Sequence, residues 1–188
     1  DAAARVPYYE GILAYETGDL RTALRRFRFV ETTSLRLSEA AFAAGATMYL
    51  AQTYRTLGRD REAETLALSA TRDVAGMDAC TQADVLSDQG WLLARSAGSA
   101  ERAIELLRGG LARRAACPNV GAEASTRTDL AWVLLERGDD AGAARALAEA
   151  RAVQVEPDAR IAAYWLDIDG QLALRAGRSG EALGRFER

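Results

Sequence analysis

Apolar residues recur at steps of three and four along most of the chain, separated by charged or small polar residues. One such stripe consists of Leu20, Ala23, Leu24, Phe27 and Val30, and another of Ala143, Ala144, Leu147 and Ala150. These steps place side chains on one face of an α-helix. Val, Ile and Thr do not cluster in alternating runs, and Ala, Leu, Arg and Glu, which favour helices, dominate. The pattern predicts an all-α protein with short turns.

The glycines reveal an internal repeat. Gly18, Gly58, Gly98 and Gly138 stand 40 residues apart, and Gly177 follows after 39. Each comes just after an apolar stripe, where a glycine with positive φ commonly ends a helix. An Ala follows each glycine after five residues, and four positions further on stand Phe27, Ala67, Leu107, Leu147 and Phe186. Each unit is therefore predicted to be a helix, a tight turn, a second helix and a linker.

The repeat divides residues 1–188 into units of about 1–37, 38–78, 79–118, 119–156 and 157–188. Their first helices are expected at 5–17, 38–57, 80–97, 120–137 and 158–176, and their second helices at 19–34, 60–75, 100–116, 140–154 and 179–188. One helix hairpin cannot bury its apolar face alone, so stacking of neighbouring units is expected to supply the core. The pair Gly109 and Gly110 lies inside a predicted helix and is expected to shorten or kink it.

The repeat resembles the tetratricopeptide repeat (TPR) family, whose unit carries Trp-x-x-Leu-Gly-x-x-Tyr, then Gly, then Ala-x-x-x-Phe. Matching positions are Gly11, Gly18, Ala23 and Phe27 in the first unit, Leu50, Ala51, Tyr54, Gly58 and Ala63 in the second, Leu130, Ala131, Gly138, Ala143 and Leu147 in the fourth, and Gly170, Ala173, Gly177, Ala182 and Phe186 in the fifth. In the third unit Trp91 takes the place of the small residue, so this unit either packs differently or interrupts the stacking. The resemblance implies a right-handed superhelical solenoid of about five antiparallel helix hairpins. A period longer than the usual 34 residues predicts helices of roughly 15–18 residues.

Units of this length are similar to those of LuxR-type ATP-dependent transcription activators, of proteins carrying caspase-like CHAT proteases, and of other bacterial signalling proteins. The resemblance implies a scaffold or sensor module that binds a protein or peptide and regulates an effector domain outside this fragment. The alternative is the small-molecule-sensing domain of a LuxR-type ATP-dependent transcription activator. The chain begins at Asp1 and stops at Arg188 within a predicted helix, so we interpret it as a piece of a longer polypeptide.

In the TPR family the first helices line a concave groove that binds the partner. By position, the resemblance implies a groove lined by Tyr8, Ile12 and Tyr15; Met48, Gln52 and Arg55; Asp88, Leu92 and Arg95; Thr128, Trp132 and Leu135; and Asp167, Gln171 and Arg175. Arg55 and Arg95 occupy equivalent positions on neighbouring units and are candidates to hold a carboxylate or phosphate; the alternative is a pair of solvated helix-end arginines. Trp132 and Tyr8 are either anchors for a partner or fillers between units.

The composition excludes several kinds of catalytic and metal-binding site. All 24 basic residues are Arg, Lys and His are absent, and 40 residues are Ala. The chain therefore lacks a phosphate-binding or Schiff-base Lys and the His of catalytic pairs or metal sites. We expect no enzyme, no cofactor and no metal. An Arg-only, Ala-rich composition is typical of a GC-rich bacterial genome.

The remaining expectations concern partners and location. The net charge of -3 and the divergent faces of Arg21, Arg25, Arg26 and Arg28 argue against direct nucleic-acid binding. No apolar run approaches the roughly 20 residues of a membrane helix. Cys80 and Cys117 are expected to be small thiols of a cytoplasmic protein, and self-association through the ends of the array is expected.

Overall fold

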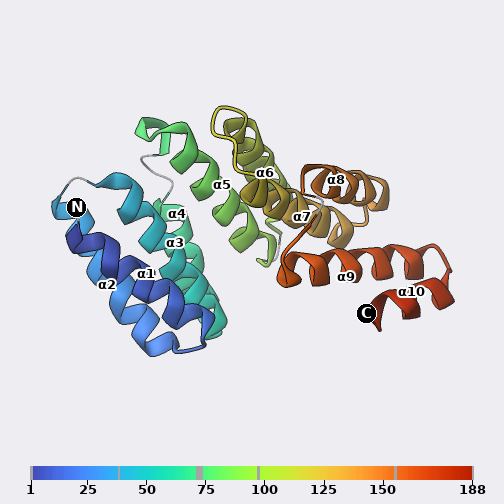
Figure 1. Cartoon of the computed structure of the whole chain (residues 1–188), viewed down its shortest axis with the longest axis horizontal. Helices are drawn as coiled ribbons and strands as arrows, with labels where there is room; N and C mark the ends of the chain where they lie inside the picture. Colours follow the sequence, from blue (N-terminus) through green and yellow to red (C-terminus); the bar gives the residue numbers. More distant parts are fainter. Residues whose placement is uncertain (1, 38, 71–73, 97, 155, 188) are drawn as a thin grey trace.

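The computed structural model describes residues 2–37, 39–70, 74–96, 98–154 and 156–187. All regular secondary structure in these ranges is helical. The α-helices are α1 (Ala2–Glu16), α2 (Leu20–Arg36), α3 (Ala40–Thr56), α4 (Asp60–Ala70), α5 (Ala79–Ala94), α6 (Ala100–Arg114), α7 (Val120–Glu136), α8 (Asp140–Val153), α9 (Ala159–Arg175) and α10 (Ser179–Phe186), with a short 3-10 helix at Val74–Gly76. Consecutive helices pack as pairs, and each pair also contacts the next (Figure 1). The all-α, stacked-hairpin prediction is confirmed, although α10, with 8 residues, is shorter than expected. The helix expected at 60–75 is seen as α4 up to Ala70; residues 71–73 lie outside the described residues, and Val74 begins the 3-10 helix.

The five repeat glycines each sit in the turn inside a helix pair. Gly18, Gly58, Gly98, Gly138 and Gly177 have φ between 73° and 84°. This is the left-handed region, in which residues with a Cβ are strained, so the spacing of the glycines reflects a backbone requirement. Two of these glycines are followed by an Asp that caps the next helix: Asp19 Oδ1 accepts a hydrogen bond of 3.1 Å from the backbone N–H of Thr22, and Asp139 Oδ1 accepts one of 2.9 Å from that of Gly142.

In the first, third and fifth pairs a large residue of the second helix packs on a glycine of the first helix. A Cβ added to Gly11 would lie 2.7 Å from Phe27 Cε1, and one added to Gly90 would lie 2.7 Å from Leu107 Cγ. The Ala that follows each turn glycine by five residues, such as Ala103, has no exposed surface. Small residues at these contacts therefore let the two helices approach closely.

The third pair keeps this contact with a shift of one residue. Gly90, and not Trp91, packs against Leu107, so the assignment of Trp91 to the small position is wrong. The reason is where α5 ends: its last residue, Ala94, stands four before Gly98, whereas α1 ends two residues before Gly18. Stacking is not interrupted, because one core cluster continues from α5 and α6 to Ile168 on α9. α6 runs without a break through Gly109 and Gly110, from Ala100 to Arg114, and ends two residues before the expected residue 116.

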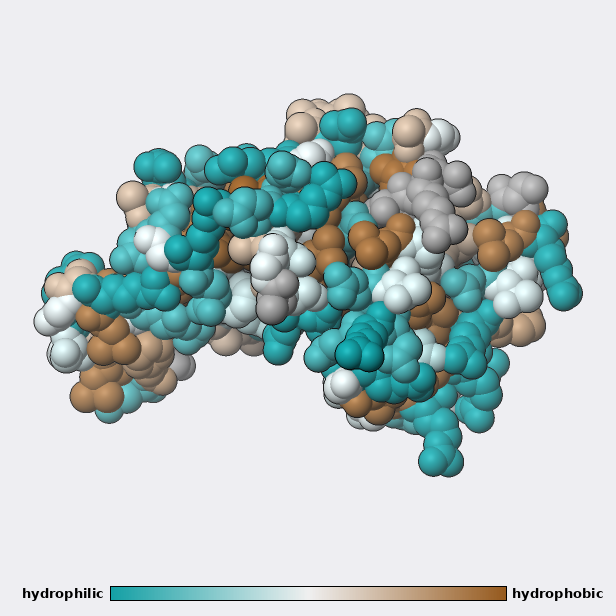
Figure 2. Space-filling model, turned by 180° about the vertical axis from the view of Figure 1, so that it is seen from behind, coloured by the Kyte–Doolittle hydropathy of each residue, from teal (hydrophilic) through white to brown (hydrophobic). Residues whose placement is uncertain are grey.

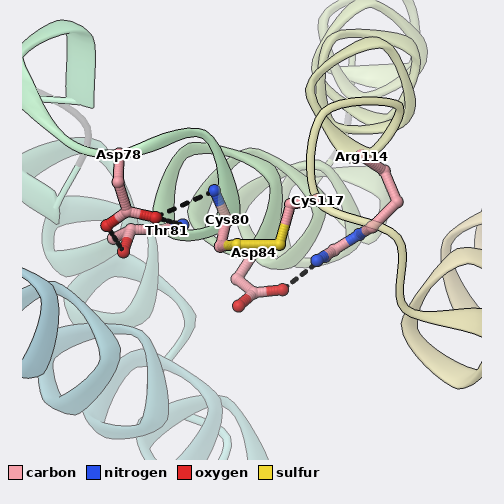
Figure 3. Close-up of a disulfide and its surroundings, with 6 residues drawn as sticks. All are labelled: Asp78, Cys80, Thr81, Asp84, Arg114 and Cys117. Atoms are coloured by element: carbon pink, nitrogen blue, oxygen red, sulfur yellow. Dashed lines mark hydrogen bonds and ion pairs between the residues drawn. A yellow bond between two sulfur atoms is a disulfide. The ribbon is translucent and has the colours of Figure 1, made fainter.

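The two cysteines form a disulfide, which corrects the expectation of free thiols. Cys80 lies at the start of α5 and Cys117 follows α6, and their Cα atoms are 5.3 Å apart. The bond closes the third pair at its open end, opposite its turn (Figure 3). Beside it, the buried guanidinium of Arg114 is ion-paired with Asp84, one turn along α5 from Cys80. The covalent link and the ion pair together fix α5 against α6.

The face shown in Figure 2 is mostly hydrophilic, with scattered hydrophobic areas. At the two ends of the array, exposed apolar side chains include Tyr9 and Leu13 on α1 and Leu183 and Phe186 on α10. Among the described residues, none of the helices combines the length and the apolar character that a membrane crossing requires.

Candidate binding groove

The odd-numbered helices turn one face toward a common groove. On α3, α5 and α7 the groove residues lie six before, two before and one after the small residue that packs on the second helix: Gly45, Tyr49 and Gln52 on α3, Asp84, Asp88 and Trp91 on α5, and Ser125, Asp129 and Trp132 on α7. On α9 Tyr164 lies six before Gly170, whereas α1 contributes Tyr8, Tyr15 and Glu16 at other positions. Steps of four and three residues keep these side chains on one face of each helix. Equivalent residues therefore form rows that cross neighbouring helices.

Two hollows open along this face. The first, of about 380 Å³, lies between α1, α3 and α5 and includes Tyr8 and Phe42 in its lining. The second, of about 320 Å³, is lined by residues from all five odd-numbered helices. Tyr49 and Asp88 line both, so the hollows are parts of one groove. In Figure 2 the lower outline of the molecule is indented between the N-terminal pairs and the last pair.

Aromatic rings flank the second hollow on two sides. On one side Tyr49 stacks on Phe27, with ring centroids 4.8 Å apart. On the other side the Trp91 ring meets Trp132 edge-on at 5.3 Å and Tyr164 at 6.2 Å. Such packing fixes the rings, so the walls are largely preformed.

Two carboxyl groups line the same hollow as these rings. Asp88 and Asp129 are half-buried at equivalent positions of α5 and α7, and no hydrogen bond or ion pair to either side chain is found among the described residues. Burial, and then the charge of Asp84, raises the pKa of Asp88 to about 7, against the opposing effect of Arg114. Burial, and then the charge of Asp88, raises the pKa of Asp129 to about 7, against the opposing effect of Arg160. The groove thus holds two carboxyl groups that change charge near neutral pH.

The tyrosines beside these carboxyl groups stay protonated. Burial, and then the neighbouring Asp88, raises the pKa of Tyr49 to about 12. Burial, and then Tyr49, raises the pKa of Tyr8 above its usual value. Both phenols therefore remain neutral hydrogen-bond donors over the physiological range.

Comparison with known proteins identifies the fold. No protein-family model matches the chain, and no curated protein matches it in sequence. Among solved structures, a Podosopora anserina protein with nearly identical TPR-like repeats of kinesin light chain type superposes with a TM-score of 0.71, 16% identity and coverage of 97% of this chain and 91% of that one. A single-substitution variant of that protein gives 0.72, 14%, 100% and 93%, and the MamA protein gives 0.57, 16%, 98% and 88%. The chain has the TPR-like fold.

Within the TPR-like fold, some residues expected in the groove do line it. Tyr8 lines the first hollow, Tyr15 and Gln52 line the second, and Asp88 lines both. Trp132 lies against Trp91 at the edge of the second. Ile12 packs against the buried core between α1, α2 and α3, which includes Phe27 and Leu50. Whether these residues bind a partner stays a prediction.

Other expected groove residues are buried in the TPR-like core. Met48, Leu92, Thr128 and Leu135 are each no more than 3% exposed. Thr128 Oγ1 accepts a hydrogen bond of 2.7 Å from Trp165 Nε1, inside the stack. Their placement on the groove surface is therefore wrong. On α3 the expected stripe of residues 48, 52 and 55 shares only residue 52 with the observed stripe of 45, 49 and 52. On α5 the earlier end of the helix displaces the pattern by one residue, so Trp91 stands where Leu92 was expected.

The expected arginine pair lies outside the two hollows. Arg55 donates to Ser96 Oγ at 3.4 Å and lies 3.9 Å from Asp60 Oδ1. Burial lowers the pKa of Arg55, and the charge of Arg95 lowers it further against the opposing effect of Asp60. Arg95 is exposed. The two side chains thus feel each other's charge, and a carboxylate or phosphate clamp between them stays a prediction.

The expected residues of α9 are engaged within the chain. Gln171 Nε2 donates to Asp167 Oδ2 at 2.8 Å, and Arg175 forms an ion pair of 3.0 Å with Asp140. Asp167, Gln171 and Arg175 do not line the two hollows.

Several groove residues were not expected from the sequence: Tyr49, Asp84, Trp91, Asp129, Arg160 and Tyr164. A signal for most of them existed. On α3, α5 and α7 they lie at fixed distances from the small residue that packs on the second helix. Asp88 and Asp129, for example, each stand two residues before that small residue, which is Gly90 on α5 and Ala131 on α7. Recognising that match required Gly90, and not Trp91, as the small residue of the third unit.

Proposed function

We propose that this chain is a non-catalytic binding module that holds a protein or peptide segment in the groove of its odd-numbered helices. The observation that carries the proposal is the second hollow, to which all five of these helices contribute. A concave surface with fixed aromatic rings and a few polar groups is the usual form of a binding site. The described residues contain no group of three or more His, Cys, Asp or Glu side chains arranged to hold a metal ion.

The role of the module would be that of a scaffold or sensor that regulates an effector domain outside residues 1–188. Because the rings and the disulfide-linked third pair fix the groove, we expect its backbone to move little on binding. A bound partner would then act on the effector by its presence at the groove.

A peptide selection tests the proposal. A random 12-residue peptide library is selected on the immobilised protein, and the binding of enriched peptides is measured by fluorescence anisotropy. We expect Trp91→Ala to weaken binding at least tenfold, because an anchor residue commonly contributes that much. The matched control is Phe29→Ala, since Phe29 is 52% exposed on α2 and lines neither hollow. Melting temperatures establish that both variants are folded. Enriched peptides that bind the Trp91 variant as tightly as the wild type would refute the groove as the site.

The arginine pair is tested with the same peptides. If Arg55 and Arg95 hold a carboxylate, the double variant Arg55→Glu and Arg95→Glu should lose peptides with an acidic residue or a free C-terminus. Unchanged binding of such peptides would remove the pair from the site.

A small-molecule sensor is the second candidate. The observation that favours it is the size of the second hollow, about 320 Å³, which falls at the lower end of small-molecule sites. A ligand that binds only the folded state raises the melting temperature, so a thermal-shift screen of sugars and metabolites tests it. The absence of any hit that Trp91→Ala abolishes would count against this candidate.

The disulfide concerns the cellular compartment in which the chain folds. A cytoplasmic location was expected from two free thiols, and the Cys80–Cys117 bond removes that basis. Because such bonds persist in oxidising compartments, we propose that the chain folds in one. The protein recovered from its native host, alkylated without reduction, should carry no label on either cysteine. Full labelling of both would support the cytoplasm instead.

Self-association through the array ends stays a prediction. Exposed apolar residues on α1 and α10 provide the surfaces. Light scattering after size exclusion should show a dimer that Leu13→Glu and Leu183→Glu return to a monomer. A monomer at all concentrations would exclude it.

A further inference from the structure

We propose that the second hollow binds the guanidinium group of an arginine side chain in an extended segment of a partner protein, with Asp88 and Asp129 as its counter-ions. The inference rests on the proposed function, since it names the chemistry that a groove-bound peptide must carry. It follows from three features of the hollow: its charge balance, its unpartnered carboxyl groups and its ring walls.

The charge balance favours a cation. The described residues that line the two hollows include four carboxyl groups, on Glu16, Asp84, Asp88 and Asp129, and one guanidinium, on Arg160. Asp84 is neutralised by its ion pair with Arg114. Among the described lining residues the only cation beside the other three acids is Arg160, which is exposed, and Arg114 behind Asp84 offsets part of the charge of Asp88. An arriving cation therefore meets a net negative field in a site of restricted hydration.

The carboxyl groups need a partner. Asp88 and Asp129 lie close enough for the charge of Asp88 to act on Asp129, yet neither has an ion pair or a hydrogen bond among the described residues. Half-buried carboxylates without donors are costly, and a ligand that supplies N–H groups relieves this cost. The structure thus presents acceptors for which the chain itself supplies no donor.

The rings favour arginine over other cations. Tyr49, Trp91 and Tyr164 line the same hollow as the two carboxyl groups, and the Trp91 and Tyr164 rings meet edge-on. A guanidinium is planar, stacks on aromatic faces and offers N–H groups to two carboxylates at once. An ammonium group has a more strongly held hydration shell and no flat face, so it fits this arrangement less well.

Binding should depend on pH. The titratable and charged groups that face the site are Tyr15 and Glu16 on α1, Tyr49 on α3, Asp84 and Asp88 on α5, Asp129 on α7, and Arg160 and Tyr164 on α9, with Arg114 of α6 behind Asp84. Of these, Asp88 and Asp129 have pKa values raised to about 7. A guanidinium binds their ionised forms, so binding releases protons and the affinity should rise by about tenfold or more from pH 6 to pH 8.

The test starts from a capped nine-residue peptide with one central arginine among Gly and Ser. Its control replaces arginine by citrulline, which has the same shape and no charge. Nuclear magnetic resonance follows the indole N–H signals of Trp91, Trp132 and Trp165, and titration gives the affinity. We expect the arginine peptide to shift the Trp91 signal and to bind at least tenfold more tightly than the citrulline peptide.

Variants assign the effect to the two carboxyl groups. Asp88→Asn with Asp129→Asn should remove the preference for arginine and the pH dependence. Arg160→Gln should raise the affinity severalfold, because it removes the competing charge. Glu136→Gln, an exposed acid on α7 away from both hollows, is the matched control and should change nothing.

The outcomes separate this inference from the proposed function. If library peptides bind the groove but show no arginine requirement, or if citrulline binds equally well, the inference is overturned while peptide binding stands. If Nα-acetylarginine amide binds as tightly as the nine-residue peptide, the assignment to a partner segment fails, and the result supports a small-molecule sensor instead. If neither library peptides nor the arginine peptide binds, both proposals fall.

Discussion

Substituting Asp129 by Asn should stabilise the protein, and the gain should grow with pH. Asp129 has a pKa raised from 3.8 to about 7 by burial and by the charge of Asp88. Between these two pH values the folded chain holds a proton at Asp129 that the unfolded chain has lost. The folded state is therefore favoured least above pH 7, where Asp129 must ionise in the groove. Asn keeps the shape of the side chain and removes the charge.

The size of the effect follows from the shift. One pKa unit corresponds to about 1.4 kcal/mol, so a rise of about three units costs the folded state about 4 kcal/mol above pH 7. We take this as an upper value, because the groove is open to water and its charges are partly screened. For a chain of this length it corresponds to a rise in melting temperature on the order of 10 °C at pH 8. Near pH 4 the difference should nearly vanish.

The assay is urea unfolding of wild type and Asp129→Asn at intervals from pH 4 to pH 8. Glu136→Gln, an exposed acid on the same helix, is the control and should leave stability nearly unchanged. In an Asp88→Asn background the gain should shrink, because the charge of Asp88 contributes to the raised pKa of Asp129. A gain that does not grow with pH, or a loss of stability at pH 8, would show that Asp129 is not an uncompensated acid.

Three further predictions concern the fold. Gly110→Ala should destabilise by about 1–3 kcal/mol, because the new Cβ would lie 3.0 Å from a backbone carbonyl oxygen of α5. Gly109→Ala, whose new Cβ would have its nearest neighbour at 3.6 Å, should stabilise by about 0.5–1 kcal/mol. Equal effects of the two substitutions in urea unfolding would contradict the close approach of α6 to α5 at Gly110. Cys80→Ser should cost about 2–4 kcal/mol, since the disulfide closes a sequence separation of 37 residues; reduction of the wild type should match it, and no change on reduction would argue against the bond. Thr128→Val should cost about 1–3 kcal/mol by leaving the Trp165 N–H without an acceptor, while Thr128→Ser should be milder; similar losses for both would indicate a packing effect.

The turns could be read from the sequence because a turn of this kind demands a specific residue. Positive φ selects glycine, so a series such as Gly18, Gly58 and Gly98 records the backbone directly. The alanine and leucine contacts that follow have a fixed distance from the same turn. The disulfide could have been read as well, because Cys80 and Cys117 bracket the predicted hairpin and an antiparallel pair brings its two ends together.

The groove was harder to predict, for a physical reason. A helix such as α3 or α7 is packed on several sides, so its apolar pattern does not tell which face turns to the groove. One residue of error rotates the expected face by about 100°. Met48 was therefore assigned to the groove although it is buried, and Tyr49, next to it, was missed. In the third unit the earlier end of α5 added a further shift, because the end of a helix is not visible in the spacing of the glycines alone.

The disulfide also determines how the array would respond to force. If the two ends are pulled apart, the hairpins without a covalent link can extend fully, but the segment between Cys80 and Cys117 is bypassed by the bond. At about 3.5 Å per residue, a separation of 37 residues withholds on the order of 130 Å of extension. Under tension the α5–α6 pair, which carries Asp88 and Trp91, would stay folded after the neighbouring pairs had unfolded. Single-molecule stretching with and without a reductant would measure the difference in the length of the extended chain.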